Sequence, residues 1–201
     1  MSDRDRVLDY SAFLHPPSPL FRDYLAGKPA VAPFFDGTGW DLDALAARAE
    51  AALTLTRSLD TLAEVLARQQ EARGAPRAAQ RARELAAPGA VAIVTGQQAG
   101  LFGGPLYVLY KALAAVKVAA ALAARRQAPV VPVFWVASDD HDFAEVRSTT
   151  VLDEAFQLHT VRYAPRQEPQ GEPAAQIVLD DTIEALIDEL RAALPAAPAR
   201  D

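Results

Sequence analysis

The sequence predicts an α/β fold with a parallel sheet and flanking helices, preceded by a helical N-terminal segment. Three patterns follow one another: an apolar run over residues 91–94, an alanine-rich helical pattern over 106–126, and a second apolar run over 129–136. A strand, a helix and a strand in succession form a βαβ unit, in which the strands are parallel and the crossover is right-handed. The chain contains one such unit, so we expect an incomplete core.

The first part of the chain predicts an extended arm followed by helices. Residues 1–39 are rich in proline and aromatic side chains, with one short helix near 20–26. Leucine and alanine recur with helical spacing over 41–73, and this pattern ends at Gly74. A further helix covers 77–87. One apolar stripe on these helices indicates a scaffold that packs against a sheet.

The last part of the chain predicts short strands and a final helix. The expected strands cover 148–152, 156–163 and 176–179, and the helix covers 180–193 with Asp180 or Asp181 as its cap. We therefore expect two domains. Residues 1–89 carry the arm and the helices that pack on the core, and residues 90–201 carry the βαβ core and the start of a connecting segment.

Composition excludes several classes of protein. Hydrophobic residues make up 51% of the chain and charged residues 23%, with a net charge of -6, which argues against a general nucleic-acid binder. The absence of cysteine excludes disulfides, thiolate zinc sites and cysteine nucleophiles. Lys117 interrupts the longest apolar run, and the opening residues lack the apolar block of a secretory signal. We expect a cytoplasmic protein with small-molecule substrates and no membrane partner.

A glycine-rich segment follows the first strand of the βαβ unit. Glycines between a strand and a helix allow close backbone approach to a ligand, and the helix start offers free N–H groups to an anion such as a phosphate or a carboxylate. The segment matches neither the dinucleotide fingerprint nor a Walker loop. The candidate binding residues here are Thr95, Gly96, Gln97, Gln98, Gly100 and Gly104. A turn with no ligand is the alternative interpretation.

An acidic segment, Asp139-Asp140-His141-Asp142, directly follows the second strand. Carboxylates around an imidazole are compatible with a metal site, with a base and its orienting acid, or with a grip on a substrate ammonium group. A helix cap at Asp140 or Asp142 is the simpler alternative. We predict catalysis or substrate binding and no bound metal, because adjacent residues on one turn seldom converge on an ion. The carboxyl ends of parallel strands share one edge, so this segment and the glycine-rich segment should face one crevice.

The helix over 106–126 brings a lysine near the glycine-rich segment. Lys111 lies four residues after Tyr107 and so shares its face. At that place a lysine is suited to meet a phosphate. Lys117 is expected to be a solvated charge, and His15 and His159 are expected to be packing or surface residues.

Two stretches of the sequence resemble one protein family over most of the region between residues 91 and 146. The stretches are VAIVTGQQAGLFGGPLYVLYKALAAVK and PVVPVFWVASDDHDFAEV. They are similar to the BshC family, the cysteine ligases of bacillithiol biosynthesis. The elements T-G-Q-Q-A-G, G-P-L-Y, Y-K and D-H-D-F occur in the order and spacing of that family.

The resemblance implies a Rossmann-like core related to class I nucleotidyl-transfer folds, in an enzyme that joins L-cysteine to glucosaminyl-malate. Family members are far longer and form homodimers through a coiled coil, so this chain would carry the first part of the core. The HIGH and KMSKS signatures of ATP-handling class I enzymes are not recognisable. The cofactor is therefore unknown, with ATP or another nucleotide as the candidate.

The amide-forming reaction gives each candidate residue an expected role. Gly96 and Gly100 with the helix start would hold a phosphate or carboxylate, and Lys111 would offset negative charge. Gln97 and Gln98 would bond to sugar hydroxyls or to the malyl group. The catalytic candidates are Lys111, Asp140, His141 and Asp142, of which the last three would bind the cysteine ammonium group or accept its proton. Tyr107, Gly104, Thr95 and Asp139 complete the expected substrate-binding set.

Two alternatives to this enzyme are carried forward. The chain is also consistent with a non-catalytic binding module, or a truncated copy that acts through a partner chain. An ATP-dependent ligase that acts on a different amino-sugar conjugate is the other alternative.

Overall fold

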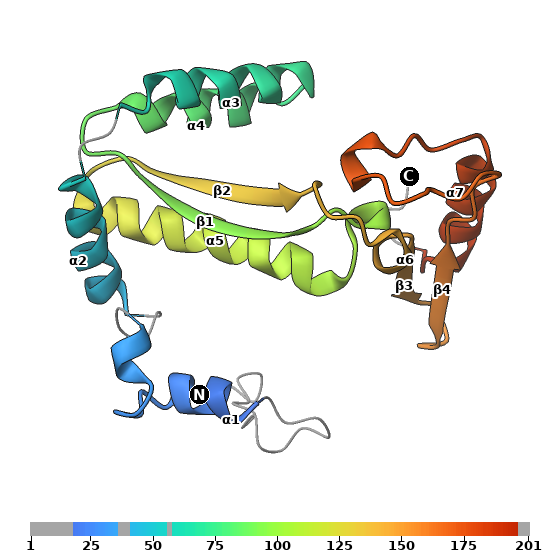
Figure 1. Ribbon diagram of the computed structural model, residues 1–201, viewed down its shortest axis with the longest axis horizontal. Coiled ribbons are helices and arrows are strands. Elements are labelled where there is room, and N and C mark those ends of the chain that lie inside the picture. Colours follow the sequence, from blue (N-terminus) through green and yellow to red (C-terminus); the bar gives the residue numbers. More distant parts are fainter. Residues whose placement is uncertain (1–17, 36–40, 56–57, 197–201) are drawn as a thin grey trace. The chain divides into compact units, whose positions relative to one another are not determined.

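The computed structural model describes residues 18–35, 41–55 and 58–196 (Figure 1). The chain divides into two compact units, Met1–Arg57 and Ser58–Asp201. The first unit contains α1 (Pro19–Leu25), the 3₁₀ helix η2 (Ala32–Phe34) and α2 (Leu42–Leu53). The expected boundary between residues 89 and 90 stays a prediction, and His15 lies outside the described residues.

The single helical pattern expected over 41–73 is wrong, because two helices share it. α2 ends at Leu53, and α3 (Asp60–Ala72) begins after an interruption. Thr54 Oγ1 donates a hydrogen bond to the Ala51 carbonyl at 2.7 Å. Ser58 Oγ donates to the Asp60 carboxylate at 2.8 Å. Such hydroxyl groups compete with the helical hydrogen bonds of the backbone, while the apolar spacing continues across the break.

The βαβ unit is confirmed in the second unit of the chain. β1 (Val91–Gln98) and β2 (Val130–Ala137) pair in parallel, and α5 (Leu106–Arg126) connects them. β1 extends beyond the apolar run of residues 91–94, so Thr95, Gly96, Gln97 and Gln98 belong to the strand rather than to the turn in which they were expected. Main-chain pairing with β2 holds these polar residues in extended conformation whatever their side chains prefer.

Gly96 makes this extension of the strand possible. Its partner in the ladder is Trp135, and a Cβ atom at position 96 would lie 2.6 Å from the Trp135 carbonyl oxygen. No side chain fits at that distance without displacing the neighbouring main chain. The glycine therefore serves the pairing of the two strands, as well as any ligand beside them.

Helices pack on the two faces of this sheet. In Figure 1, α5 lies along one face, and α3 and α4 (Pro76–Arg83) lie on the other. A core of Ala63, Leu85 and Val131 joins α3 and the 3₁₀ helix η3 (Glu84–Ala86) to β2. These contacts confirm the expected scaffold role for α3 and η3, and for α2 this role stays a prediction.

The helix α5 is long and apolar enough to cross a membrane by length and composition. It contacts both β1 and β2, and Ala115, Ala119 and Leu122 are its buried residues. A core helix of an α/β domain has the same composition. The expectation that the protein has no membrane partner stays a prediction.

A smaller antiparallel sheet follows the βαβ unit. α6 (Phe143–Val146) leads into β3 (Ser148–Leu152), which pairs with β4 (Leu158–Arg162), and α7 (Thr182–Ala193) packs near β4. Val161, Tyr163 and Leu186 form the core of this part. Leu101 and Phe143 pack against the same core, so one apolar cluster anchors both the glycine-rich segment and the start of α6.

The strand expected over 176–179 is wrong. The structure has a 3₁₀ helix there, η5 (Ala174–Gln176), and Val178 is exposed. The amides of Ala174 and Ala175 donate to the carbonyls of Asp140 and Ser138, both at 2.8 Å. These main-chain donors therefore hold the acidic segment in place and do not pair with a sheet.

The carboxylate of Asp180 organises the start of α7. It accepts hydrogen bonds from the Thr182 side chain and main chain and from the Arg166 amide. These bonds, the Thr182 hydroxyl first, lower the pKa of Asp180 from 3.8 to about 2. Asp181 is the formal capping residue of α7, and its side chain makes no capping hydrogen bond.

We expect Gly96→Ala to lower the free energy of unfolding by about 1–3 kcal/mol, because the added methyl group must displace the Trp135 main chain. Urea denaturation followed by circular dichroism measures the change. Val94→Ala, at an exposed position of the same strand, is the matched control and should change stability by about 0.5 kcal/mol or less. Equal effects of the two substitutions would contradict the role of Gly96 in strand pairing.

Candidate functional site

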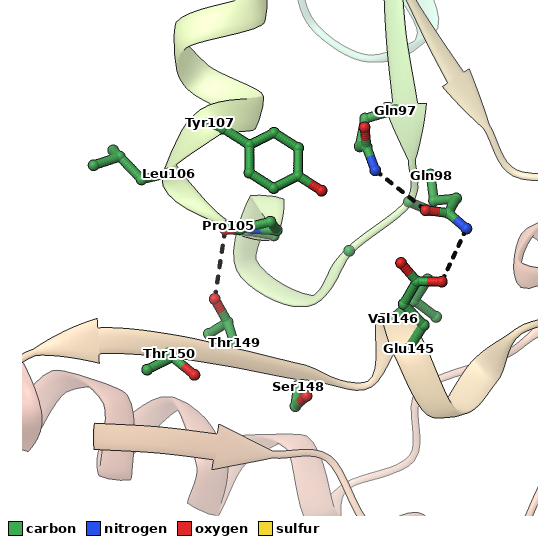
Figure 2. Close-up of a pocket in the computed structure, with 13 residues that line it drawn as sticks. Gln97, Gln98, Pro105, Leu106, Tyr107, Glu145, Val146, Ser148, Thr149 and Thr150 are labelled. Carbon is green, nitrogen blue, oxygen red and sulfur yellow. Dashed lines mark hydrogen bonds between the residues drawn. The ribbon is translucent and has the colours of Figure 1, made fainter. Parts of the chain in front are cut away.

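A cavity of about 250 Å³ lies at the carboxyl end of β1 (Figure 2). Its walls come from the end of β1, the glycine-rich turn, the first turn of α5, the end of α6 and β3. The lining residues are Gln97, Gln98, Ala99, Gly100, Gly104, Pro105, Leu106, Tyr107, Glu145, Val146, Ser148, Thr149 and Thr150. The cavity is therefore at the edge of the sheet where ligands of α/β proteins bind.

The glycine-rich turn has an unusual main-chain path. Phe102, with φ of 51°, precedes two glycines that also have positive φ. A Cβ atom at Gly100 would lie 2.8 Å from the Gly104 Cα atom, so the turn closes tightly on itself. Non-glycine residues with positive φ are uncommon and cluster at ligand sites. This turn forms one wall of the cavity.

A chain of hydrogen bonds crosses the site from a cation to two carboxylates. Lys111 Nζ donates to Gln97 Oε1 at 2.7 Å, and Gln97 Nε2 donates to Gln98 Oε1 at 3.2 Å. Gln98 Nε2 then donates to Asp140 Oδ2 at 2.7 Å and to Glu145 Oε2 at 3.2 Å. An ammonium group can only donate and a carboxylate can only accept, so both amides have one permitted orientation.

Lys111 is held by the protein itself. Besides Gln97, its ammonium group contacts the Gly96 carbonyl at 3.3 Å and lies 5.2 Å from the centre of the Tyr107 ring. Lys111 is half-buried and is not among the residues that line the cavity. The contacts suit a residue that orients Gln97, and the expected contact with a phosphate stays a prediction. Lys117 is exposed.

Within the acidic segment, two carboxylates serve the local main chain. Asp142 caps α6 by accepting from the Glu145 amide at 2.9 Å, and Asp140 Oδ1 accepts from the Asp142 amide at 2.9 Å. The Asp142 amide and, next, the Gln98 side chain hold the pKa of Asp140 below its ordinary value of 3.8. Asp140 is therefore ionised at neutral pH, with its other oxygen bonded to the amide chain.

The structure brings together some of the predicted site residues and leaves others apart. Gln97, Gln98, Gly100, Gly104 and Tyr107 line the cavity, and Asp140 joins them through Gln98. The predicted residues that do not line it are Thr95, Gly96, Lys111, Asp139, His141 and Asp142. The side chains of Asp139 and His141 are exposed next to Asp140. The predicted roles of all these residues stay predictions.

Sequence reasoning missed the second wall of the cavity. Glu145, Ser148, Thr149 and Thr150 line it, and Thr149 Oγ1 donates to the Gly104 carbonyl at 3.5 Å. The run Ser148-Thr149-Thr150 was expected to be a strand, which is confirmed, but its contact with the turn joins residues 45 positions apart. The closeness of Glu145 to the acidic segment was the one available signal.

The charge of the cavity is negative. Among the described residues that line it, Glu145 is the only charged side chain. No group of three His, Asp or Glu side chains in the described parts of the chain is placed to hold a metal ion. The absence of a bound metal stays a prediction.

One protein family matches nearly the whole chain. The family model described as "Bacillithiol biosynthesis BshC, N-terminal Rossmann-like domain" matches residues 7–200. The chain belongs to the BshC family. Its Rossmann-like fold and the resemblance found in its sequence are thereby confirmed.

Curated members of the BshC family show the same likeness. The protein named "Putative cysteine ligase BshC" from Salinibacter ruber is 36% identical over 177 residues, which is 88% of this chain and 32% of that protein. The protein of the same name from Koribacter versatilis is 35% identical over 170 residues, or 85% and 31%. That from Heliobacterium modesticaldum is 55% identical over 76 residues, or 38% and 14%.

The match also defines how much of a BshC protein is present. The aligned region spans about a third of the length of the Salinibacter and Koribacter proteins, 32% and 31%. The described cavity therefore lies in a chain that corresponds to about a third of these relatives. The activity of a full-length BshC protein is taken up below as a proposal.

Replacing Gln98 tests the hydrogen-bond chain of this BshC-family site. In Gln98→Ala we expect the pKa of Asp140 to rise toward 3.8, and to remain lower because the bond from the Asp142 amide persists. Titration of the side-chain carboxyl carbon by NMR measures it. Gln157→Ala, in the β3–β4 turn, is the control. An unchanged Asp140 titration in Gln98→Ala would show that the contact is not made in solution.

The same pKa has a consequence for stability. The folded pKa of Asp140 is lower than the 3.8 of the unfolded chain, so its hydrogen bonds add stability above pH 3.8. This contribution is lost as the pH falls through the folded pKa. In Gln98→Ala the folded pKa lies closer to 3.8, so the stability lost through Asp140 on acidification should be smaller and should be complete at a higher pH, as urea denaturation at a series of pH values measures.

Proposed function

We propose that this chain supplies the N-terminal Rossmann-like part of an enzyme that adds L-cysteine to glucosaminyl-malate in bacillithiol biosynthesis. The observation that carries the proposal is the family match over residues 7–200, with relatives named as cysteine ligases. The cavity at the end of β1 supports it, because most of its lining residues, from Gln97 to Tyr107 with Glu145 and Val146, lie in the segments that carry the family resemblance. The chain is then one part of a carbon–nitrogen ligase.

The proposed reaction joins two substrates through an amide bond. Amide formation requires an activated cysteine carboxyl group; a nucleoside triphosphate would supply this activation, as an acyl phosphate with release of ADP or as an acyl adenylate with release of pyrophosphate. The neutral amine of glucosaminyl-malate attacks the acyl carbon and forms the C–N bond. The C–O bond to the phosphate or to AMP breaks with its electron pair, and the nitrogen loses one proton to a base. The thiol is unchanged.

The described residues support binding and proton transfer in this reaction. Gln97 and Gln98 present amide groups to a substrate in the cavity. Asp140 is a carboxylate at neutral pH, and His141 beside it is exposed and so accessible as a proton acceptor. Lys111 keeps the two amides in their orientation. In this reaction the attacking amine belongs to glucosaminyl-malate and not, as expected from the sequence, to cysteine, and transfer of its proton is the step that these groups suit best.

The cavity itself does not fit a triphosphate. No lysine or arginine side chain is among its described lining residues, and Glu145 would repel phosphate oxygens. The residues expected to hold an anion, Gly96 and Gly100 with the start of α5, thus have no facing cation among the described lining residues. We therefore assign the nucleotide no site in this cavity.

The proposal is tested by assaying the protein at its natural length with cysteine, glucosaminyl-malate and ATP. His141→Ala should lower kcat by about 10²–10⁴ if His141 is the general base. His159→Ala is the matched control, since His159 is exposed and pairs with Glu189 at 3.2 Å. Formation of the thiol product is followed by mass spectrometry.

Two results would contradict the proposal. A natural-length protein that folds and binds small molecules without forming the amide would favour the non-catalytic binding module. Efficient use of serine or glycine in place of cysteine would favour a ligase for a different conjugate. The homodimer, the cytoplasmic location and the absence of nucleic-acid partners stay predictions.

A further inference from the structure

We propose that the Glu145 carboxylate binds a protonated primary amine in the cavity between the glycine-rich turn and β3. The ligand class is a small amine that also carries hydrogen-bonding groups, such as an amino sugar or an amino acid. The choice of ligands rests on the proposed function, whereas the binding itself follows from the charge and geometry of the cavity.

The first argument is charge. Glu145 is exposed on α6, and it is the only charged side chain among the described residues that line the cavity. Its Oε2 atom accepts a hydrogen bond from the neutral Gln98 amide. No ion pair to its second oxygen is found within the described parts of the chain, and that oxygen bears no dashed line in Figure 2. The negative charge is thus available to a cation.

The second argument is the fixed direction of the amide chain. Gln98 donates to Glu145 and Asp140 because its oxygen is already occupied by Gln97, whose own oxygen accepts from Lys111. Gln98 cannot turn its carbonyl toward the carboxylates without breaking this chain. The carboxylate end of the site therefore keeps its acceptor character whichever ligand enters.

The third argument is the neutral wall opposite. Ser148 is half-buried, and no hydrogen bond of its hydroxyl group is found among the described residues. Thr150 Oγ1 is engaged with Thr160 Oγ1 at 2.8 Å, and Thr149 with the Gly104 carbonyl. Ser148 is thus the hydroxyl most available to a ligand. A volume of about 250 Å³ suits one small ring or one amino acid.

Two substrates of the proposed reaction could supply the primary ammonium group. Both cysteine and the glucosaminyl substrate carry it. Binding of each ligand to the natural-length protein is measured by isothermal titration calorimetry beside an analogue that lacks the amine. The pairs are L-cysteine with 3-mercaptopropionic acid, and D-glucosamine with D-glucose.

We expect at least one amine to bind about tenfold or more tightly than its analogue, and Glu145→Gln to abolish that difference. The pair that shows the preference identifies the source of the ammonium group. Glu189→Gln, which removes an exposed carboxylate on α7 that pairs with His159, is the control and should retain the preference. Because Glu145 is exposed, its substitution by the isosteric glutamine should leave the fold intact, which circular dichroism checks.

Equal binding of the amines and their analogues to the unsubstituted protein would overturn the inference, without any need for a variant. An amine preference that persists in Glu145→Gln would also overturn it. The result is independent of the ligase assay. Amine binding without amide formation would leave this inference standing and remove the proposed function, and amide formation without a Glu145-dependent preference would do the reverse.

Discussion

The parallel pairing of β1 with β2 is the constraint on which the rest of the site depends. Gln98 at the end of β1 lies opposite Ala137 at the end of β2, so the segments that follow both strands leave the sheet at one edge. Gln98 can then reach Asp140, 42 positions later in the chain. Gly96 permits this pairing, since no side chain fits against Trp135. Because Gly96 allows the two strands to pair, it also determines where Gln98 meets Asp140.

The hydrogen bonds at this edge all run in one direction, because one end of the chain is a donor and the other end consists of acceptors. Lys111 can only donate, and the carboxylates of Asp140 and Glu145 can only accept. Gln97 and Gln98 between them must both point the same way. A pair of glutamines between neutral groups would have no such preference. The separation of charge across the site is therefore what makes the orientation of its amides definite.

The parts of the fold that were predicted correctly are those that local sequence determines. α5 has the expected bounds because its helical pattern is long and Pro105 precedes it. The break between α2 and α3 has a local cause, whereas the other two incorrect predictions concern segments whose main-chain partners lie far away in the sequence. Residues 95–98 are extended because β2 pairs with them, and residues 176–179 are not a strand because nearby amides bond to the acidic segment. The spacing of hydrophobic residues does not indicate either of these distant partners.

The same limit explains why half of the cavity was found from sequence. Gln97 and Gln98 are conspicuous because amide side chains beside a buried strand need partners. In the sequence nothing distinguishes Ser148 and Thr150 from other strand residues. In the structure the second sheet places them in the cavity wall, beside the glycine-rich turn. Their position depends on Leu101 and Phe143, which enter one apolar core with Tyr163. Leu101 and Phe143 can be recognised as apolar in the sequence, but their contact with Tyr163 becomes apparent only in the folded chain.

The balance of charge at the site differs from what its glycine-rich turn suggests alone. A glycine turn before a helix favours anions when a cation faces the ligand, as in phosphate-binding loops. In this chain the ammonium group of Lys111 is turned to Gln97 and the Gly96 carbonyl, and the charge that reaches the cavity is that of Glu145. An enzyme that joins a carboxyl group to an amine must hold one partner of each kind. In the proposed reaction the charge of this wall suits the amine, and the groups that activate the carboxyl are therefore expected in a different part of the site.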